Sequence, residues 1–156
     1  MKNCKAMMKD VGPIALINRQ FCEAFKKHDS EIPIIKYQTQ DWVLDEIEAG
    51  NLYVFKDKSE VLGSMCLYMS MKNLSPDESY IESLAVRSDK HRNGYGRKMI
   101  HFAKRKSRNE GKRLLTVESF CLYDVKDFYI KCGFELEPEL GECGGHKYYR
   151  FFMKLP

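Results

Sequence analysis

Two glycines, Gly94 and Gly96, are separated by one residue in the most basic stretch of the chain. An apolar pattern with helical spacing follows directly. The backbone amides of a first helical turn have no partner within the helix, so they can bind an anion. Glycine lets a phosphate approach the backbone because no Cβ stands in the way, and Arg92 and Arg97 can add charge-assisted hydrogen bonds. We therefore expect residues 91–97 to bind a phosphate group.

Two well-known phosphate-binding patterns do not fit this loop. The dinucleotide fingerprint needs a third glycine, and Met99 occupies that position. The loop of P-loop NTPases needs a lysine followed by serine or threonine, and Lys98 is not followed by a hydroxyl residue. Glycine pairs at helix starts also often serve only the geometry of a turn, so the loop alone leaves the ligand open.

The segment 91–113 carries nine lysines and arginines against one acid, Glu110. Such a cluster fits a phosphate-bearing partner, which could be a phosphorylated cofactor or a nucleic acid, although many charge runs are only the solvated face of a helix. The alternative function is a nucleic-acid or regulatory binding module that uses the basic helix of residues 97–113. Proteins that bind single strands need stacking rings among their cations. Only Tyr95 and Phe102 could provide stacking rings in this segment, which counts against that alternative.

Glu82 is the first candidate for acid–base chemistry. It lies in the run "SYIESLAV", residues 79–86, whose alternation predicts a strand with Tyr80, Glu82 and Leu84 on one face. An acid in an otherwise apolar strand would have its pKa raised by burial, toward the range that suits a general base. The competing interpretation is an exposed glutamate on a half-solvated strand face.

Periodicity and turn residues predict helices first, then a meander of strands, and then alternating strands and helices, which is a mixed α/β layer structure. At 156 residues the chain fits one domain, and we expect a single unit over residues 1–156. Helices are expected over residues 11–27, 39–50, 96–110 and 122–132, and strands over residues 51–57, 60–71, 79–86, 112–119, from 134 onward, and 146–155.

Composition bears on the expected cellular location of the protein and on the state of its cysteines. No apolar run approaches the length of a membrane span and no secretory signal is recognisable, so a cytoplasmic location is expected. The six cysteines are then expected to be reduced. Cys143 and His146 have a spacing that could begin a metal site, but no second pair stands at matching spacing, so no metal is expected.

The stretch "YIESLAVRSDKHRNGYGRKMI", joined some thirty residues later to "DFYIKCGFEL", resembles the GNAT superfamily of acetyl-CoA-dependent N-acetyltransferases. The resemblance is strong over residues 79–137. It implies an α/β fold with a mostly antiparallel sheet of six to seven strands, a splayed strand pair and about four flanking helices. It also implies acetyl-CoA as co-substrate and an amine as acetyl acceptor.

The resemblance places coenzyme A on two segments. The family's loop pattern, (Arg or Gln)-x-x-Gly-x-(Gly or Ala), falls on residues 91–96, and its backbone amides hold the pyrophosphate. His91 stands where Arg or Gln is usual, and Arg92 beside it can offset the change. The cofactor-binding residues implied or inferred are Leu84, Ala85, Val86, His91, Arg92, Asn93, Gly94, Tyr95, Gly96, Arg97 and, at the end of its strand, Ser119.

For catalysis, the resemblance implies that Glu82 relays the proton of the amine, directly or through water, and that Tyr129 in "FYIKCGF" protonates the departing thiolate. Tyr129 could instead be a packed core aromatic. Leu122 replaces an asparagine that relatives often carry seven residues before that tyrosine, which puts one cofactor contact in doubt. A relative that binds coenzyme A without catalysis also fits these departures.

The acceptor amine has no motif of its own. The four acids of the segment "ELEPELGECGGHKYY" could favour a cationic small-molecule or peptide amine. The aromatic last strand offers an edge for a homodimer, and the sequence leaves the oligomeric state open. The four acids are Glu135, Glu137, Glu139 and Glu142.

Overall fold

The computed structural model describes residues 2–26 and 39–156, which form four α-helices and eight strands. The helices are α1 (Val11–Lys26), α2 (Gln40–Glu48), α3 (Tyr95–Asn109) and α4 (Lys126–Lys131). The strands are β1 (Lys2–Lys5), β2 (Leu52–Asp57), β3 (Glu60–Tyr68), β4 (Glu78–Val86), β5 (Leu114–Phe120), β6 (Glu135–Leu136), β7 (Gly141–Cys143) and β8 (His146–Lys154). Among the described helices, none combines the length and the apolar character needed to cross a membrane.

The strands form one hydrogen-bonded sheet in the order β1-β2-β3-β4-β5-β8-β6, with β7 paired to β8. The pairing of β4 with β5 is parallel, whereas β1–β2, β2–β3, β5–β8, β6–β8 and β7–β8 are antiparallel. The mixed α/β class and the mostly antiparallel sheet are confirmed. The expected count of six to seven strands is wrong, because β1 and β7 are short segments held by strand pairing, and their own composition carries no strand signal.

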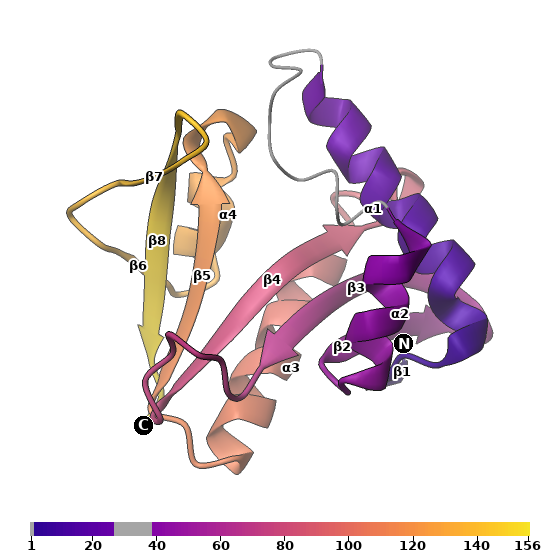
Figure 1. Cartoon of the computed structure of the whole chain (residues 1–156), viewed down its shortest axis with the longest axis horizontal. Helices are drawn as coiled ribbons and strands as arrows, with labels where there is room; N and C mark the ends of the chain where they lie inside the picture. The colour runs from indigo at the N-terminus through magenta and orange to yellow at the C-terminus, as the bar shows by residue number, and fades with distance from the viewer. Residues whose placement is uncertain (1, 27–38) are drawn as a thin grey trace. The chain divides into compact units, whose positions relative to one another are not determined.

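The chain divides into two compact units, Met1–Leu67 with Ser83–Met99, and Tyr68–Glu82 with Ile100–Pro156. In the first unit, the helices α1 and α2 lie against β1, β2 and most of β3 (Figure 1). Thr39 is the N-cap of α2, and its Oγ1 accepts a hydrogen bond of 3.2 Å from the amide of Trp42. The core of this unit is built from fully buried aliphatic and aromatic side chains, among them Ile14, Ile17, Val43, Phe55 and Leu62.

A buried ion pair fixes the start of the first unit. The Nζ atom of Lys56 in β2 lies 2.6 Å from Oδ1 of Asp10, and both side chains are at most 10% exposed. Asp10 also accepts a hydrogen bond of 2.9 Å from the amide of Met7. Removing one partner of a buried ion pair leaves the other charge buried and unpaired, which is costly. This contact therefore holds the turn before α1 against the sheet.

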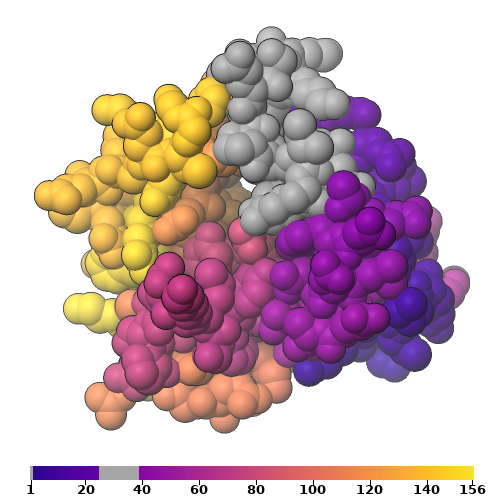
Figure 2. All heavy atoms as spheres, viewed as in Figure 1, coloured from indigo at the N-terminus to yellow at the C-terminus, as the bar shows by residue number. Residues whose placement is uncertain are grey.

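In the second unit, β5 and β8 run side by side as an antiparallel ladder from Leu114 opposite Lys154 to Phe120 opposite Tyr148 (Figure 1). Leu115, Val117 and Phe151 are buried in these two strands, and the ring of Phe151 packs on that of Tyr129 in α4. The hairpin of β7 and β8 lies at the surface of this unit and is coloured amber to yellow in Figure 2. A hydrogen bond of 2.7 Å between the buried hydroxyls of Ser79 and Ser107 joins β4 to α3.

Gly63 marks a close approach within the first unit. A Cβ built on Gly63 in β3 would lie 2.9 Å from the carbonyl oxygen of Ala85 in β4 and 2.9 Å from the sulfur of Met99 in α3. Real Cβ atoms do not come this close to backbone atoms, so only glycine allows these three elements to pack as they do. The contact therefore holds together the strand and the helix that flank the glycine loop.

We predict that Gly63→Ala lowers the free energy of unfolding by about 1–3 kcal/mol, because the added methyl group forces backbone to move. Gly12→Ala is the matched control, since a Cβ at Gly12 in α1 meets nothing within 4 Å. That variant should be neutral or slightly stabilising. Urea denaturation of both variants measures the difference, and equal stabilities would contradict the packing constraint.

Candidate active site

The glycine loop joins the end of β4 to the start of α3. After Val86, the 3₁₀-helix η3 (Ser88–Lys90) turns the chain, and Arg87 fixes this turn with ion pairs of 2.6 Å to Asp89 and 2.6 Å to Glu60. The Nε2 atom of His91 lies 2.8 Å from the carbonyl oxygen of Val86. The His91 ring therefore holds the loop against the end of the strand that precedes it.

The conformation of residues 92–95 opens the helix start. Arg92 and Gly94 have φ values of 63° and 75°, which turn the backbone in the left-handed region. The side-chain amide of Asn93 donates to the carbonyl oxygens of Lys90 and His91, at 3.2 Å and 3.1 Å. The bond from Lys98 N to Gly94 O, at 3.1 Å, is the first one of α3, so the amides of 94–97 precede the helical ladder and suit an anion.

The parallel pairing of β4 with β5 is short. It runs from Glu78 opposite Leu114 to Ile81 opposite Val117, and Ser83 in β4 then has a φ of 53°. A serine in the left-handed region interrupts the regular alternation of a strand. This confirms the expected splayed strand pair.

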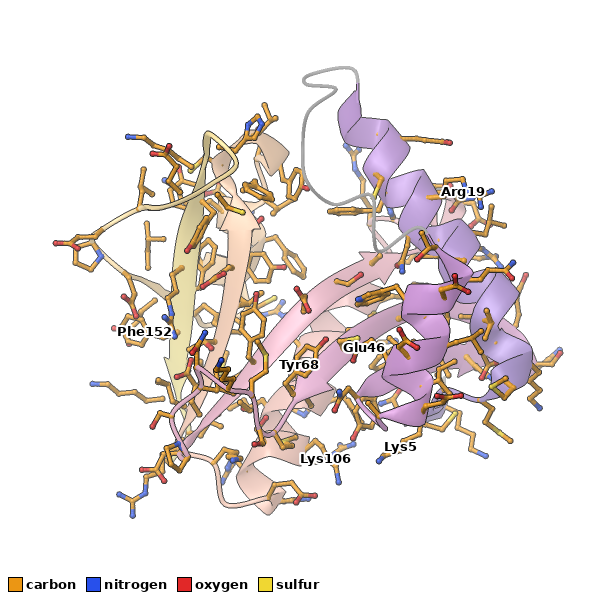
Figure 3. The ribbon with its side chains drawn as sticks, viewed as in Figure 1. Lys5, Arg19, Glu46, Tyr68, Lys106 and Phe152 are labelled. Atoms are coloured by element: carbon orange, nitrogen blue, oxygen red, sulfur yellow. The ribbon has the colours of Figure 1, made fainter. Side chains whose placement is uncertain are left out.

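Glu82 directly follows the last paired residue of β4 and is half-buried. Its Oε2 accepts a hydrogen bond of 3.0 Å from the hydroxyl of Tyr68, which lies at the end of β3 (Figure 3). The rings of Tyr68 and Tyr80 stack with their centroids 6.3 Å apart. The expected common face of Tyr80 and Glu82 is thus a surface lined by phenols and a carboxylate.

Glu118 belongs to this polar surface, and sequence reasoning missed it. It directly follows Val117, the last residue of β5 that pairs with β4. On the other side of β5, in the ladder with β8, Glu118 stands opposite Arg150. The signal was the same as for Glu82, an acid within an apolar strand, in the run "LLTVESF". The sequence could have suggested Glu118, but not that it shares a surface with Glu82.

Burial raises the pKa of Glu118 above its ordinary value, and of its charged neighbours Arg150 lowers it whereas Glu82 raises it. A hydrogen bond from Tyr80 also lowers this pKa. The pKa of Tyr80 itself is raised, first by burial and then by the charge of Glu118. Tyr148 in β8 has its pKa raised chiefly by Glu118. Glu118 is therefore the electrostatic centre of this surface.

Arg150 makes its shortest ion pair with a carboxylate other than Glu118. Its Nη2 atom lies 2.6 Å from Oε1 of Glu78, whose side chain is only 7% exposed. The same Oε1 accepts a hydrogen bond of 2.6 Å from Thr116. The Nε atom of Arg150 lies 3.9 Å from Glu137, so the guanidinium is shared among several acids. A single cation facing several carboxylates leaves this face of the sheet negative.

Tyr129 is buried on α4 among aromatic rings. Its ring centroid lies 5.0 Å from that of Phe151 and 5.8 Å from that of Phe134. Burial raises the pKa of Tyr129, with Cys132 adding a smaller effect, so the hydroxyl stays protonated at neutral pH. Ser119 is also buried, opposite Tyr149 in the ladder of β5 and β8. The geometry suits Tyr129 both as a proton donor and as a core aromatic.

The model of the acetyltransferase (GNAT) family matches residues 15–134 of the sequence. The chain belongs to the GNAT acetyltransferase family. This confirms the resemblance drawn from the glycine loop and the "FYIKCGF" block, and with it the assignment to a family of N-acetyltransferases that use acetyl-CoA. Among curated proteins, none matches the sequence.

Solved structures agree with the GNAT fold. PaiA N-acetyltransferase from Thermoplasma acidophilum, solved in complex with coenzyme A, superposes with a TM-score of 0.78 at 16% identity, covering 96% of each chain. Ard1 from Thermoplasma volcanium gives 0.76 at 18% identity, covering 99% of this chain and 97% of its own. N-acetylglutamate synthase from Neisseria gonorrhoeae, complexed with coenzyme A and N-acetyl-glutamate, gives 0.78 at 18% identity, with 99% of this chain matching 35% of that larger one.

Proposed function

We propose that the protein transfers the acetyl group of acetyl-CoA directly to a primary amine while both are bound. The observation that carries this proposal is the strand, loop and helix of residues 84–97, whose glycine loop opens the first turn of α3 in a chain of the GNAT family. Solved neighbours that were crystallised with coenzyme A support the donor.

In this proposal, the backbone of 94–97 binds the pyrophosphate of coenzyme A, and the side chains of Arg92 and Arg97 add positive charge. Asn93 and His91 shape the loop through the hydrogen bonds that they already make. The backbone of Leu84, Ala85 and Val86 pairs with the pantetheine arm, and Tyr95, Gly96 and Ser119 complete the contacts.

Acetyl transfer needs a neutral amine, an oriented thioester and a proton for the departing thiolate. The amine nitrogen attacks the thioester carbonyl carbon, and the carbon–sulfur bond then breaks. Glu82 accepts the proton that the nitrogen loses as the amide forms, either directly or through a water. Tyr129 gives its hydroxyl proton to the sulfur.

We further propose that the acceptor is cationic. Glu135, Glu139 and Glu142 are exposed, and Glu137 is half-buried beside Arg150. These acids would attract a positively charged amine toward the second unit. A turnover assay across cationic and neutral amines tests this, and equal rates for both would overturn it. A cytoplasmic location and a homodimer remain predictions.

The loop assignment predicts that Gly94→Ala weakens acetyl-CoA binding by about tenfold or more. The residue has a φ of 75°, so a side chain strains the turn and places a Cβ beside the expected phosphate. Isothermal titration calorimetry with acetyl-CoA measures the loss.

Gly111→Ala is the matched control, because Gly111 follows the other end of α3 with a φ of 77°. A Cβ at either glycine meets nothing within 4 Å. Both variants should lose similar stability, about 1 kcal/mol. If both bind acetyl-CoA alike, the loop does not hold the cofactor, and no binding by the natural protein would overturn the proposed function.

Glu82→Gln should lower kcat by on the order of 10²–10⁴ while leaving the affinity for acetyl-CoA unchanged, because only the proton acceptor is lost. Steady-state release of free thiol with the best acceptor measures kcat. Glu48→Gln, at an exposed position at the end of α2, is the control for a lost carboxylate. A loss smaller than tenfold would leave Glu82 without a role in proton transfer.

Tyr129→Phe should lower kcat by about tenfold or more with little change in melting temperature, since the ring stays and only the proton donor goes. Tyr149→Phe is matched to it, because Tyr149 also packs on Phe151, with ring centroids 5.9 Å apart. If both variants keep full activity, the role of Tyr129 is packing alone.

A further inference from the structure

Glu82 and Glu118 occupy equivalent positions where the parallel ladder stops. Each is the residue after the final pair, Ile81 on β4 and Val117 on β5. The hydroxyl of Tyr68 donates a hydrogen bond of 3.0 Å to Glu82, and hydrogen bonding by Tyr80 lowers the pKa of Glu118. The two tyrosine rings stack on each other. The surface thus holds two matched phenol–carboxylate pairs.

Among the acids on this surface, Glu118 has the surroundings that best suit the binding of a positively charged ligand. From β4 it is faced by Glu78, Tyr80 and Glu82, and from β8 by Tyr148 and Arg150. The single guanidinium in this set makes its closest ion pair with Glu78, at 2.6 Å. The hydroxyls of Tyr80 and Tyr148 stay neutral because their pKa values are raised. An ammonium group would therefore supply the missing positive charge.

The chemistry of the proposed reaction asks for more than one proton acceptor. A basic amine reaches the protein as an ammonium ion with three N–H bonds, and the secondary amide that leaves has one. One proton must leave before the nitrogen can attack, and a second must leave as the amide forms. Glu82 accounts for the second proton only.

We propose that Glu118 is a further catalytic residue, which binds the incoming ammonium group and removes its first proton before the attack. The inference rests on the proposed acetyltransferase function. An N–H bond of the ammonium breaks, its electron pair stays on nitrogen, and the proton bonds to the Glu118 carboxylate. The neutral amine then attacks, Glu82 takes the second proton, and Tyr129 protonates the sulfur. After product release Glu118 gives its proton to water, and the proton on Glu82 returns through solvent to the Tyr129 oxygen, so one proton is released for each acetyl group transferred.

This role defines the acceptor class as basic aliphatic amines that are protonated at neutral pH. An amine with a pKa of about 10 is neutral in roughly one molecule per thousand at pH 7. An enzyme that must wait for the neutral form loses that factor, whereas one that deprotonates the bound ammonium does not. Glu118 therefore decides whether such amines are used well.

The test is the pH dependence of kcat/KM for the acceptor in Glu118→Gln. The natural protein should be level from the pKa of Glu118 up to that of the amine, and its activity should fall as pH drops through the Glu118 pKa. For an amine with a pKa of about 10, the variant should lose about a thousandfold at pH 7, and its deficit should shrink about tenfold for each unit that the pH rises. A merely structural role would lower kcat/KM equally at every pH.

Three further variants and a second acceptor sharpen the test. Glu118→Asp should restore part of the activity. Tyr80→Phe removes a hydrogen bond that stabilises the charged carboxylate, so the acidic limb should move to higher pH. Glu48→Gln, at an exposed position at the end of α2, should keep the natural profile. An acceptor amine whose pKa lies below the assay pH should react nearly equally with the natural protein and with Glu118→Gln.

The outcomes separate the two proposals. If the natural protein acetylates no amine, the proposed function fails and the role of Glu118 fails with it. If the natural protein is active and Glu118→Gln shows a deficit that is constant with pH, only the role of Glu118 is overturned. Equal deficits for acceptors of high and low pKa would overturn it as well.

Discussion

The parallel ladder between β4 and β5 stops after Ile81 and Val117, and the candidate chemistry depends on that stop. A ladder that continued would bond the backbone of the following residues and pair their side chains across the strands. Instead Ser83 takes a left-handed conformation, and Glu82 and Glu118 emerge at the point where pairing ends. A local failure of regular structure therefore places two carboxylates on one surface of the second unit.

Burying these carboxylates has an electrostatic cost, and the groups that compensate it differ from one carboxylate to the next. Glu78 is the most buried of the acids on this face and receives the guanidinium of Arg150 and the hydroxyl of Thr116. Glu82 and Glu118 receive tyrosine hydroxyls, which stabilise a carboxylate without cancelling its charge. The closest contact of the guanidinium thus goes to Glu78, whereas the two acids at the splay are stabilised by tyrosine hydroxyls.

The histidine in the glycine loop illustrates how a departure from the family pattern is accommodated. The ring of His91 bonds to the carbonyl oxygen of Val86, so it holds the loop against the strand end. An anion at a helix start is bound largely by backbone amides, which do not depend on side-chain identity. The positive φ values of Arg92 and Gly94 supply the geometry that the amides need.

The sequence by itself determined the local features: the helices, the glycine loop at the start of α3, the strand that carries Glu82 and the membership of the GNAT family. Each depends on neighbours within a few residues, through helical spacing, capping or alternation, and such patterns are written along the chain. Tertiary structure alone decided that β1 and β7 are strands, that His91 bonds to its own strand, and that Glu118 joins Glu82 on one surface. These features depend on pairing register and on which side chains meet across strands, and residues distant in the sequence set both.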